Sequence, residues 1–157
     1  MYKSYLNRTD LPRGIRNNNP GNLIRTPIAW NGKIPFAQSK DTKFEQFAEL
    51  RYGIRAKMLD IINDVNEGTD TVAALITEFA PKFENNTQAY INTVASMVGL
   101  PMNAKIDLTE ERLIALCKAI SFVENGAAYA NYITDQDYAD ALAILGRSLK
   151  KKLKASR

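Results

Sequence analysis

Proline placement is the feature that most limits how this chain can fold. Four of its six prolines fall within the first 48 residues, at positions 12, 20, 27 and 35. Proline lacks a backbone N–H and clashes with the preceding helical turn, so no long helix fits between these positions. We therefore expect an irregular N-terminal segment, with short extended pieces around Leu23–Ile28 and Phe44–Phe47.

From Leu50 onward the pattern becomes helical, because apolar residues recur at intervals of three and four. We expect five helices over residues 50–67, 71–80, 87–98, 110–125 and 134–154, with Thr109 and Thr134 as N-caps of the last two. The buried face is predicted to contain Ile54, Met58, Ile61, Ile62, Val65, Tyr90, Val94, Met97, Val98, Leu113, Leu116, Cys117, Ile120 and Val123. The predicted fold class is a mainly α single domain.

Composition narrows the chemistry that this chain can perform. It contains no histidine, which excludes histidine-based triads and histidine metal ligands. Acid–base catalysis would depend on Asp, Glu, Lys or Tyr, and we expect no metal and no other cofactor. The single cysteine, Cys117, lies in an apolar run and is expected to be a small core residue.

Positive charge gathers at the C-terminus, although the formal net charge of the whole chain is only +4. The stretch RSLKKKLKASR contains six basic residues and no acidic one. It is either a site of weak attraction to an anionic polymer or a solvated helix end. We expect no nucleic-acid partner, because no recognition helix or basic–aromatic interleaving is present.

Hydropathy predicts no transmembrane segment, since no apolar run approaches the roughly 20 residues that a spanning helix needs. The first 14 residues also lack the apolar region of a secretory signal. We therefore expect a protein that is made in the cytosol and is carried or released by something else.

Glu124 is the strongest candidate for a catalytic residue. It lies at the C-terminal end of an apolar helix, directly after Val123 and before Asn125 and Gly126. The negative end of the helix dipole and the apolar setting both disfavour an ionised carboxylate. A general acid must hold a proton near neutral pH, so this setting suits one. The alternative is an ordinary surface glutamate near a helix end.

Other candidates are less distinctive. Glu84 precedes a helix N-terminus, which favours an ionised carboxylate and therefore a stabilising role. Glu45 and Asp41 lie in DTKFEQF, where Glu45 would alternate with Phe44 along a strand and face away from it. Trp30 and Tyr90 have aromatic faces that could stack on sugar rings, although core packing is the simpler interpretation of Tyr90.

The stretch RGIRNNNPGNLI, residues 13–24, carries strong turn chemistry. Asn and Gly tolerate positive φ angles, and Asn side chains bond to nearby backbone. The simpler interpretation is a structured loop between two elements. The alternative is a polar wall for a ligand rich in hydroxyls and amides, with Asn18, Asn19 and Asn22 binding that ligand.

Three motifs together resemble a family of phage and prophage proteins. They are RGIRNNNPGNL with a following W.G, then D.KFEQFAELRYGIRA, then FENNTQAYINTVA, spread over roughly residues 12–130. Members of that family are described as virion structural proteins or virion-associated lysins. The resemblance implies that other virion proteins are possible partners.

A second resemblance is to lysozyme-like glucosaminidases and lytic transglycosylases, in which a helix ending in a catalytic glutamate precedes a polar loop. Here the loop comes first, and AISFVENG, residues 119–126, resembles the missing catalytic helix with ENG in place of Glu-Ser-Gly. This implies a circularly permuted lysozyme-like catalytic domain over residues 1–149, followed by a basic tail over residues 150–157. Permutation is physically reasonable because domain termini often lie close together at the surface.

The resemblance implies a function: cleavage of the glycan strands of bacterial peptidoglycan, with Glu124 as general acid and with Asn18, Asn19, Asn22, Trp30, Glu84 and Tyr90 binding substrate. The protein would be located in the virion or host cytoplasm and act at the host cell wall. One glutamate is enough for a lytic transglycosylase, whereas a hydrolase needs a second carboxylate. The alternative function is a non-catalytic virion or tail component.

Overall fold

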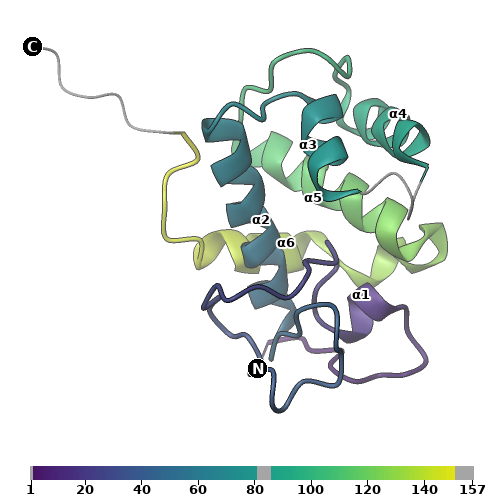
Figure 1. Ribbon diagram of the computed structural model, residues 1–157, viewed down its shortest axis with the longest axis vertical. Coiled ribbons are helices and arrows are strands. Elements are labelled where there is room, and N and C mark those ends of the chain that lie inside the picture. Colours follow the sequence, from purple (N-terminus) through teal and green to yellow (C-terminus); the bar gives the residue numbers. More distant parts are fainter. Residues whose placement is uncertain (1, 81–85, 151–157) are drawn as a thin grey trace, which may run out of the picture.

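The computed structural model describes residues 2–80 and 86–150. Within these ranges the helices are α1 (Arg13–Arg16), α2 (Leu50–Asn66), α3 (Val72–Phe79), α4 (Thr87–Val98), α5 (Glu110–Asn125), the 3-10 helix η1 (Ala127–Tyr132) and α6 (Asp135–Ala143). The prediction of a mainly α fold is confirmed. Figure 1 shows the irregular N-terminal segment gathered at one end of the molecule, with the long helices above it.

Helix boundaries follow local sequence signals closely. Thr109 caps α5 by accepting a hydrogen bond from the backbone N–H of Arg112, and Asn86 caps α4 in the same way. Gly99 ends α4 in the left-handed conformation, with φ of 78°. At the start of α6, Thr134 and Asp137 form a complete capping box. The predicted caps of the last two helices are therefore confirmed.

The predicted extent of the last helix is wrong. Helix α6 ends at Ala143, whereas the prediction extended to residue 154. Gly146 adopts a φ of 73°, which a right-handed helix does not allow. Residues 151–154 of the predicted helix lie outside the described residues. Two short helices, α1 and η1, were not predicted, because each is too short to show a periodic apolar pattern.

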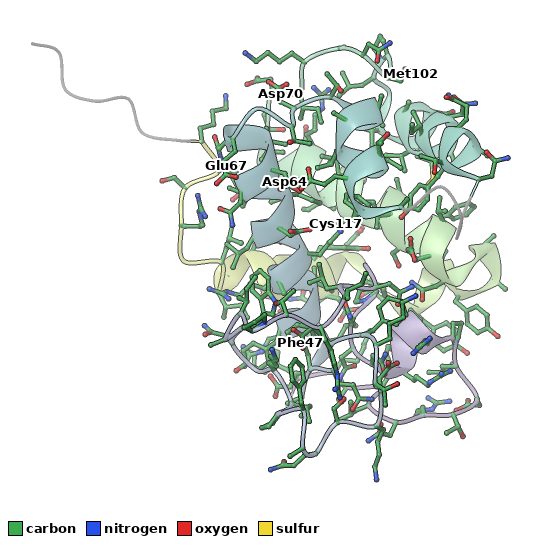
Figure 2. The ribbon with its side chains drawn as sticks, viewed as in Figure 1. Phe47, Asp64, Glu67, Asp70, Met102 and Cys117 are labelled. Carbon is green, nitrogen blue, oxygen red and sulfur yellow. The ribbon has the colours of Figure 1, made fainter. Side chains whose placement is uncertain are left out.

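Helix α2 is the central element of the core and packs against α3, α5 and α6. Ten predicted core residues are buried: Ile54, Met58, Ile61, Ile62, Tyr90, Val94, Leu113, Leu116, Cys117 and Ile120. Figure 2 shows Cys117 in the interior of the helical part. Val65, Val98 and Val123 are only half-buried. The burial predicted for Met97 is wrong, because it is 45% exposed and lines an open groove described below.

Strand pairing plays little part within the N-terminal segment. Only single bridges join Ile24 to Phe44 and Lys33 to Phe47 in the described part of the chain. The Asn-rich loop packs directly on α2, where a Cβ atom on Gly53 would overlap the carbonyl oxygen of Asn18. Glycine at that position is therefore what allows the loop to approach the central helix.

The first residues of the chain contact its C-terminal part. The hydroxyl of Tyr5 donates a hydrogen bond to the carbonyl oxygen of Tyr132 at 2.7 Å, and their rings pack at 5.7 Å. Lys3 forms an ion pair with Asp137 at 2.8 Å. None of the described helices is long and apolar enough to cross a membrane.

Candidate active site

Glu124 lies in the last turn of α5 and is held by residues from two other parts of the fold. Its Oε1 atom accepts a hydrogen bond from the side-chain amide of Asn22 at 2.8 Å. Its Oε2 atom accepts one from the hydroxyl of Tyr90 at 2.8 Å. The half-buried carboxylate therefore joins the catalytic-helix candidate, the Asn-rich loop and α4 at one point.

The residue after Glu124 fixes the position of the loop. Asn125 is 8% exposed, and its side-chain amide donates to the carbonyl oxygen of Pro20 at 2.9 Å and to that of Ser121 at 3.1 Å. A Cβ atom on Gly14 would overlap Oδ1 of Asn125. The loop thus lies directly against the end of α5, which brings Asn22 to the carboxylate.

Asn22 has a backbone conformation that few residues adopt. Its φ angle is 50°, in the left-handed region where asparagine is favoured over most other residues. Its backbone N–H donates to the carbonyl oxygen of Asn19 at 2.9 Å, which closes the turn after Pro20 and Gly21. The Asn-Pro-Gly-Asn sequence therefore aims the Asn22 side chain at Glu124.

Tyr90 is only 2% exposed and packs edge-on against Phe79 of α3, with ring centroids 6.4 Å apart. Burial raises the pKa of its hydroxyl far above the usual range, and the neighbouring Glu124 carboxylate raises it further. Tyr90 therefore keeps its proton, and in this structure its hydroxyl donates a hydrogen bond to Glu124. It is both a core residue, as the simpler interpretation held, and a member of this site.

Two hollows lie along α4 and α5, and Tyr90, the partner of Glu124, lines the first of them. The first has a volume of about 240 Å³ and is lined by Asn86, Ala89, Tyr90, Thr93 and Val123. The second, of about 500 Å³, is lined by Asn92, Thr93, Ser96, Met97 and Phe122. Because Thr93 lines both, they form one groove along α4 and α5, and we call it the α4–α5 groove.

Asn18 and Asn19 are completely buried, and their side chains bond within the protein. The Asn18 amide donates to the carbonyl oxygen of Phe47 at 2.8 Å, and the Asn19 amide donates to that of Glu45 at 3.0 Å. Their burial leaves no accessible surface for a sugar, so in this structure they brace the loop. Of the three predicted loop asparagines, Asn22 alone lies beside Glu124.

Trp30 and Glu84 are not placed in the site. Trp30 is half-buried and packs against the hydrophobic core, and no contact joins it to Glu124. Glu84 lies outside the described residues. Substrate binding by these two residues remains a prediction.

Ordinary strand alternation, with Glu45 facing away from Phe44, does not describe this segment, because Glu45, Gln46 and Phe47 are all buried. The side chain of Glu45 is fully buried, because Lys33 covers it with Nζ 3.0 Å from Oε2, while Oε2 also accepts from the backbone N–H of Thr26. A single bridge on each side cannot set the period-two alternation of a paired strand. Glu45 therefore has no access to a substrate.

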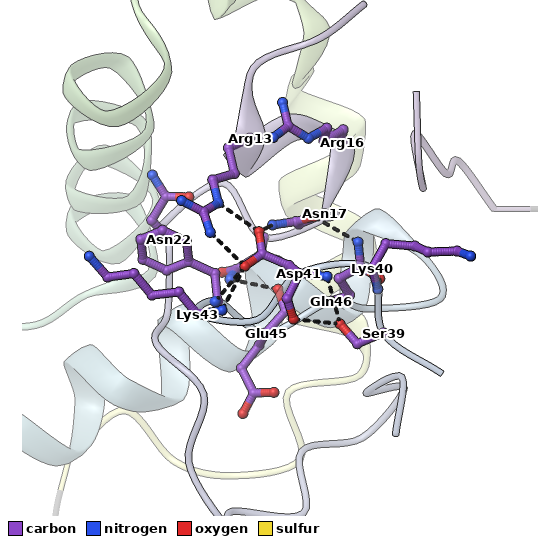
Figure 3. A network of polar contacts seen from close by, with 12 residues as sticks. Arg13, Arg16, Asn17, Asn22, Ser39, Lys40, Asp41, Lys43, Glu45 and Gln46 are labelled. Carbon is purple, nitrogen blue, oxygen red and sulfur yellow. Dashed lines mark hydrogen bonds and ion pairs between the residues drawn. The ribbon is translucent and has the colours of Figure 1, made fainter. Parts of the chain in front are cut away.

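Asp41 is also buried and fully engaged (Figure 3). Arg13 holds it with two hydrogen bonds of 2.7 and 2.8 Å, and the Asn17 amide adds another at 2.9 Å. The Arg13 hydrogen bonds hold the pKa of Asp41 well below its usual range. As an ionised carboxylate at neutral pH, Asp41 thus anchors the loop and α1.

Two residues of the site were missed by reasoning from sequence. Asn125 carried a signal, since its place in the ENG motif departs from the Glu-Ser-Gly of lysozyme-like enzymes. Gly14 carried none, because only its packing against Asn125 reveals its role. In residues 2–80 and 86–150, no group of three or more metal-binding side chains comes together.

Comparison with known proteins places the chain among phage proteins. No family model matches it. Over 131 residues it is 34% identical to Protein P5 of Pseudoalteromonas phage PM2, an alignment that spans 81% of this chain and 78% of that protein. The matched share of both sequences is large enough to indicate common descent along most of the domain. The chain belongs to the family of this phage protein.

Proposed function

We propose that this protein cleaves the glycan strands of bacterial peptidoglycan, with Glu124 as general acid. The observation that carries the proposal is the pair of hydrogen bonds that Asn22 and Tyr90 make to the Glu124 carboxylate. A carboxylate held by two side chains from separate elements, one of which lines an open hollow, has the fixed geometry that proton transfer needs.

The two oxygens of the Glu124 carboxylate have different hydrogen-bond partners, Asn22 and Tyr90, and therefore different roles in the proposed reaction. The Asn22 amide nitrogen can only donate, so Oε1 is an acceptor in every state. The Tyr90 hydroxyl can donate to an ionised acid or accept from a protonated one. Oε2 is therefore the atom that carries the transferable proton.

The proposed reaction needs no second carboxylate. Glu124 donates its proton to the glycosidic oxygen as the bond from that oxygen to the anomeric carbon breaks. A hydroxyl of the same sugar then attacks the anomeric carbon, and its proton returns to Glu124. The product is an anhydro sugar, so the activity is that of a lytic transglycosylase. Asp41 and Glu45 are buried and paired with Arg13 and Lys33, which favours this route over hydrolysis.

The α4–α5 groove is the proposed binding site for the glycan. Its lining combines polar side chains with the apolar surfaces of Met97 and Phe122, which suits a sugar with hydroxyls and apolar ring faces. A lysozyme-like, circularly permuted architecture follows from the proposal, because the loop precedes the catalytic helix in the chain. As a phage protein, it would act on the host cell wall from the virion or during lysis.

Substitution of Glu124 by Gln tests the proposal. We expect Glu124→Gln to keep the fold and the melting temperature within a few degrees, and to lose at least about 10²-fold in turnover on purified sacculi. Mass spectrometry of the soluble products should detect anhydro-muropeptides from the wild type alone. Glu111→Gln is the matched control, because Glu111 is exposed in the first turn of the same helix.

Other results would redirect the assignment. Reducing-end products would indicate a hydrolase with a second carboxylate. Unchanged turnover in Glu124→Gln would remove Glu124 from the mechanism. No soluble product from the wild type or the variant would favour the alternative function, a non-catalytic component of the virion or tail.

A further inference from the structure

A third hollow lies beside Arg16 and Asn17 at the start of the Asn-rich loop. It has a volume of about 310 Å³ and is lined by Asn7, Thr9, Arg16, Asn17, Lys40, Asp41 and Gln46. We call it the Arg16–Lys40 pocket. Figure 3 shows Lys40 and Asn22 on opposite sides of Asp41, so this pocket is separate from the contact between Asn22 and Glu124.

The hydrogen-bond acceptors of this pocket are already occupied. Asp41 accepts from Arg13, from Asn17 and from the backbone N–H groups of Lys43 and Phe44. Both Asn17 Oδ1 and Asn7 Oδ1 accept from the Gln46 amide, at 2.8 and 3.1 Å. The remaining oxygen of Gln46 accepts from the backbone N–H of Lys40 at 3.0 Å.

The hydrogen-bond donors of the pocket are largely free. Arg16 makes one side-chain hydrogen bond in the described part of the chain, to the carbonyl oxygen of Leu11 at 3.2 Å. Within residues 2–80 and 86–150, no acceptor pairs with the Lys40 ammonium, the Asn7 amide nitrogen or the Thr9 hydroxyl. The pocket thus offers two cations and two neutral donors to a ligand.

The charges of the pocket, like its free hydrogen-bond donors, favour a ligand that accepts hydrogen bonds. The one carboxylate in the lining, Asp41, is neutralised by its two hydrogen bonds from Arg13. Arg16 and Lys40 have no carboxylate partner among the residues that the structure describes. The lining therefore has an excess of positive charge and attracts a ligand that accepts hydrogen bonds and carries negative charge.

We infer that the Arg16–Lys40 pocket binds a carboxylate group of the peptide stems that branch from the glycan. This inference rests on the proposed function, because the proposed substrate carries those carboxylates. The planar guanidinium of Arg16 matches a carboxylate in a two-bond geometry. A volume of about 310 Å³ also takes more than a bare ion, and so accommodates the amino-acid residue that bears the carboxylate.

Binding can be measured without any catalytic activity. We would record amide NMR spectra of the full chain during titration with the tripeptide L-Ala-γ-D-Glu-meso-diaminopimelate. We expect saturable shifts at the side-chain amides of Asn7, Asn17 and Gln46. The same tripeptide with its carboxylates converted to amides should produce no such shifts, and inorganic phosphate should bind at least about tenfold more weakly.

Variants locate the site. Arg16→Gln with Lys40→Gln should weaken tripeptide binding by about tenfold or more. Lys40→Gln alone serves as a second variant, because this exposed side chain makes no contact on which folding depends. Lys105→Gln is the matched control, since Lys105 is 84% exposed in the segment between α4 and α5.

Activity then separates this inference from the proposed function. On intact sacculi, the double variant should raise KM with kcat unchanged, and on peptide-free glycan chains it should match the wild type. If the wild type cleaves neither substrate, the proposed function fails and the titration still decides the pocket. Equal binding of the amidated tripeptide or of phosphate, no saturable shifts, or full affinity in the double variant would each overturn the inference.

Discussion

At the scale of single residues, the candidate site depends on Tyr90. Its hydroxyl is the only group that hydrogen-bonds to Oε2 of Glu124 among the contacts that the structure describes. Loss of this hydroxyl leaves the ring packing against Phe79 intact. It would therefore alter proton transfer without emptying the core.

Substitution of Tyr90 by Phe tests this role. We expect Tyr90→Phe to lower kcat by about 10- to 10²-fold with KM nearly unchanged, because the proton on Oε2 loses its partner. Tyr129→Phe is the control, since Tyr129 lies on η1 and packs against Tyr132. Equal kcat values for wild type and Tyr90→Phe would show that the hydroxyl does not take part.

Gly14 is a second residue on which the site depends. We expect Gly14→Ala to displace Asn125, and with it Asn22, because the added Cβ atom overlaps Oδ1 of Asn125. Turnover should fall by about tenfold or more, since small displacements of catalytic groups are costly. Gly68→Ala is the comparison variant, because it introduces backbone strain without steric overlap. The φ angle of Gly68 is +105°, but an added Cβ atom there would meet no neighbouring atom. A crystal structure of Gly14→Ala with Asn22 still on Glu124 would contradict the expectation.

At the scale of elements, helix α2 carries a charge arrangement that lowers its stability. Asp64 is half-buried near its C-terminal end, and Figure 2 shows it on α2 close to Glu67. Burial, together with repulsion from Asp60 and Glu78, raises the pKa of Asp64 from 3.8 to about 7. The folded protein therefore binds this proton more tightly than the unfolded chain does.

The pH dependence of stability follows from that shift. The contribution of Asp64 is fully present below pH 3.8, falls as the pH rises, and is lost above about pH 7. We expect Asp64→Asn to raise the melting temperature by a few degrees at pH 8 and to change it little at pH 4. Differential scanning calorimetry at both values measures this, with Asp140→Asn on α6 as control. An equal effect at both pH values would contradict the assignment.

At the scale of the whole molecule, the C-terminal end contributes little to the stability of the described fold. Lys150 pairs with Asp107 at 2.6 Å, but these side chains are 61% and 73% exposed. Exposed ion pairs stabilise proteins only weakly. The last buried apolar side chain in this part of the chain is Leu145, which is 5% exposed.

Deletion of residues 150–157 should therefore leave the melting temperature within about 2 °C of the full chain. Leu145→Ala provides the contrast, because it removes a buried side chain and should cost about 2–4 kcal/mol. Thermal unfolding followed by circular dichroism compares the two. A fall of many degrees on deletion would show that the tail packs against the domain.

Features of the fold that are encoded within a few neighbouring residues could be predicted from sequence. Caps at Thr109 and Thr134 and the end of α4 at Gly99 are encoded within a few residues, and all were predictable. The exposure of Met97 was not, because it depends on what packs nearby, and the end of α6 at Ala143 comes three residues before the nearest glycine, Gly146.

The candidate site shows the same division. Sequence alone identified Glu124 as the distinctive carboxylate and the asparagine run as a loop with unusual backbone angles. It could not show that Asn22 contacts Glu124 across 102 residues of chain, while Asn18 and Asn19 turn into the interior. Nor could it show that Lys33 covers Glu45.

Local sequence thus determined the helical class and the helix caps, and the composition excluded histidine from any acid–base chemistry. Only the tertiary structure decided which side chains meet at Glu124 and which carboxylates are withdrawn into ion pairs. The physical reason is that capping and periodicity involve residues within a turn or two of each other. The contact of Glu124 with Asn22 instead arises from the packing of the N-terminal loop against α5, and the ion pairs of Asp41 and Glu45 arise from the tertiary fold of the N-terminal segment itself.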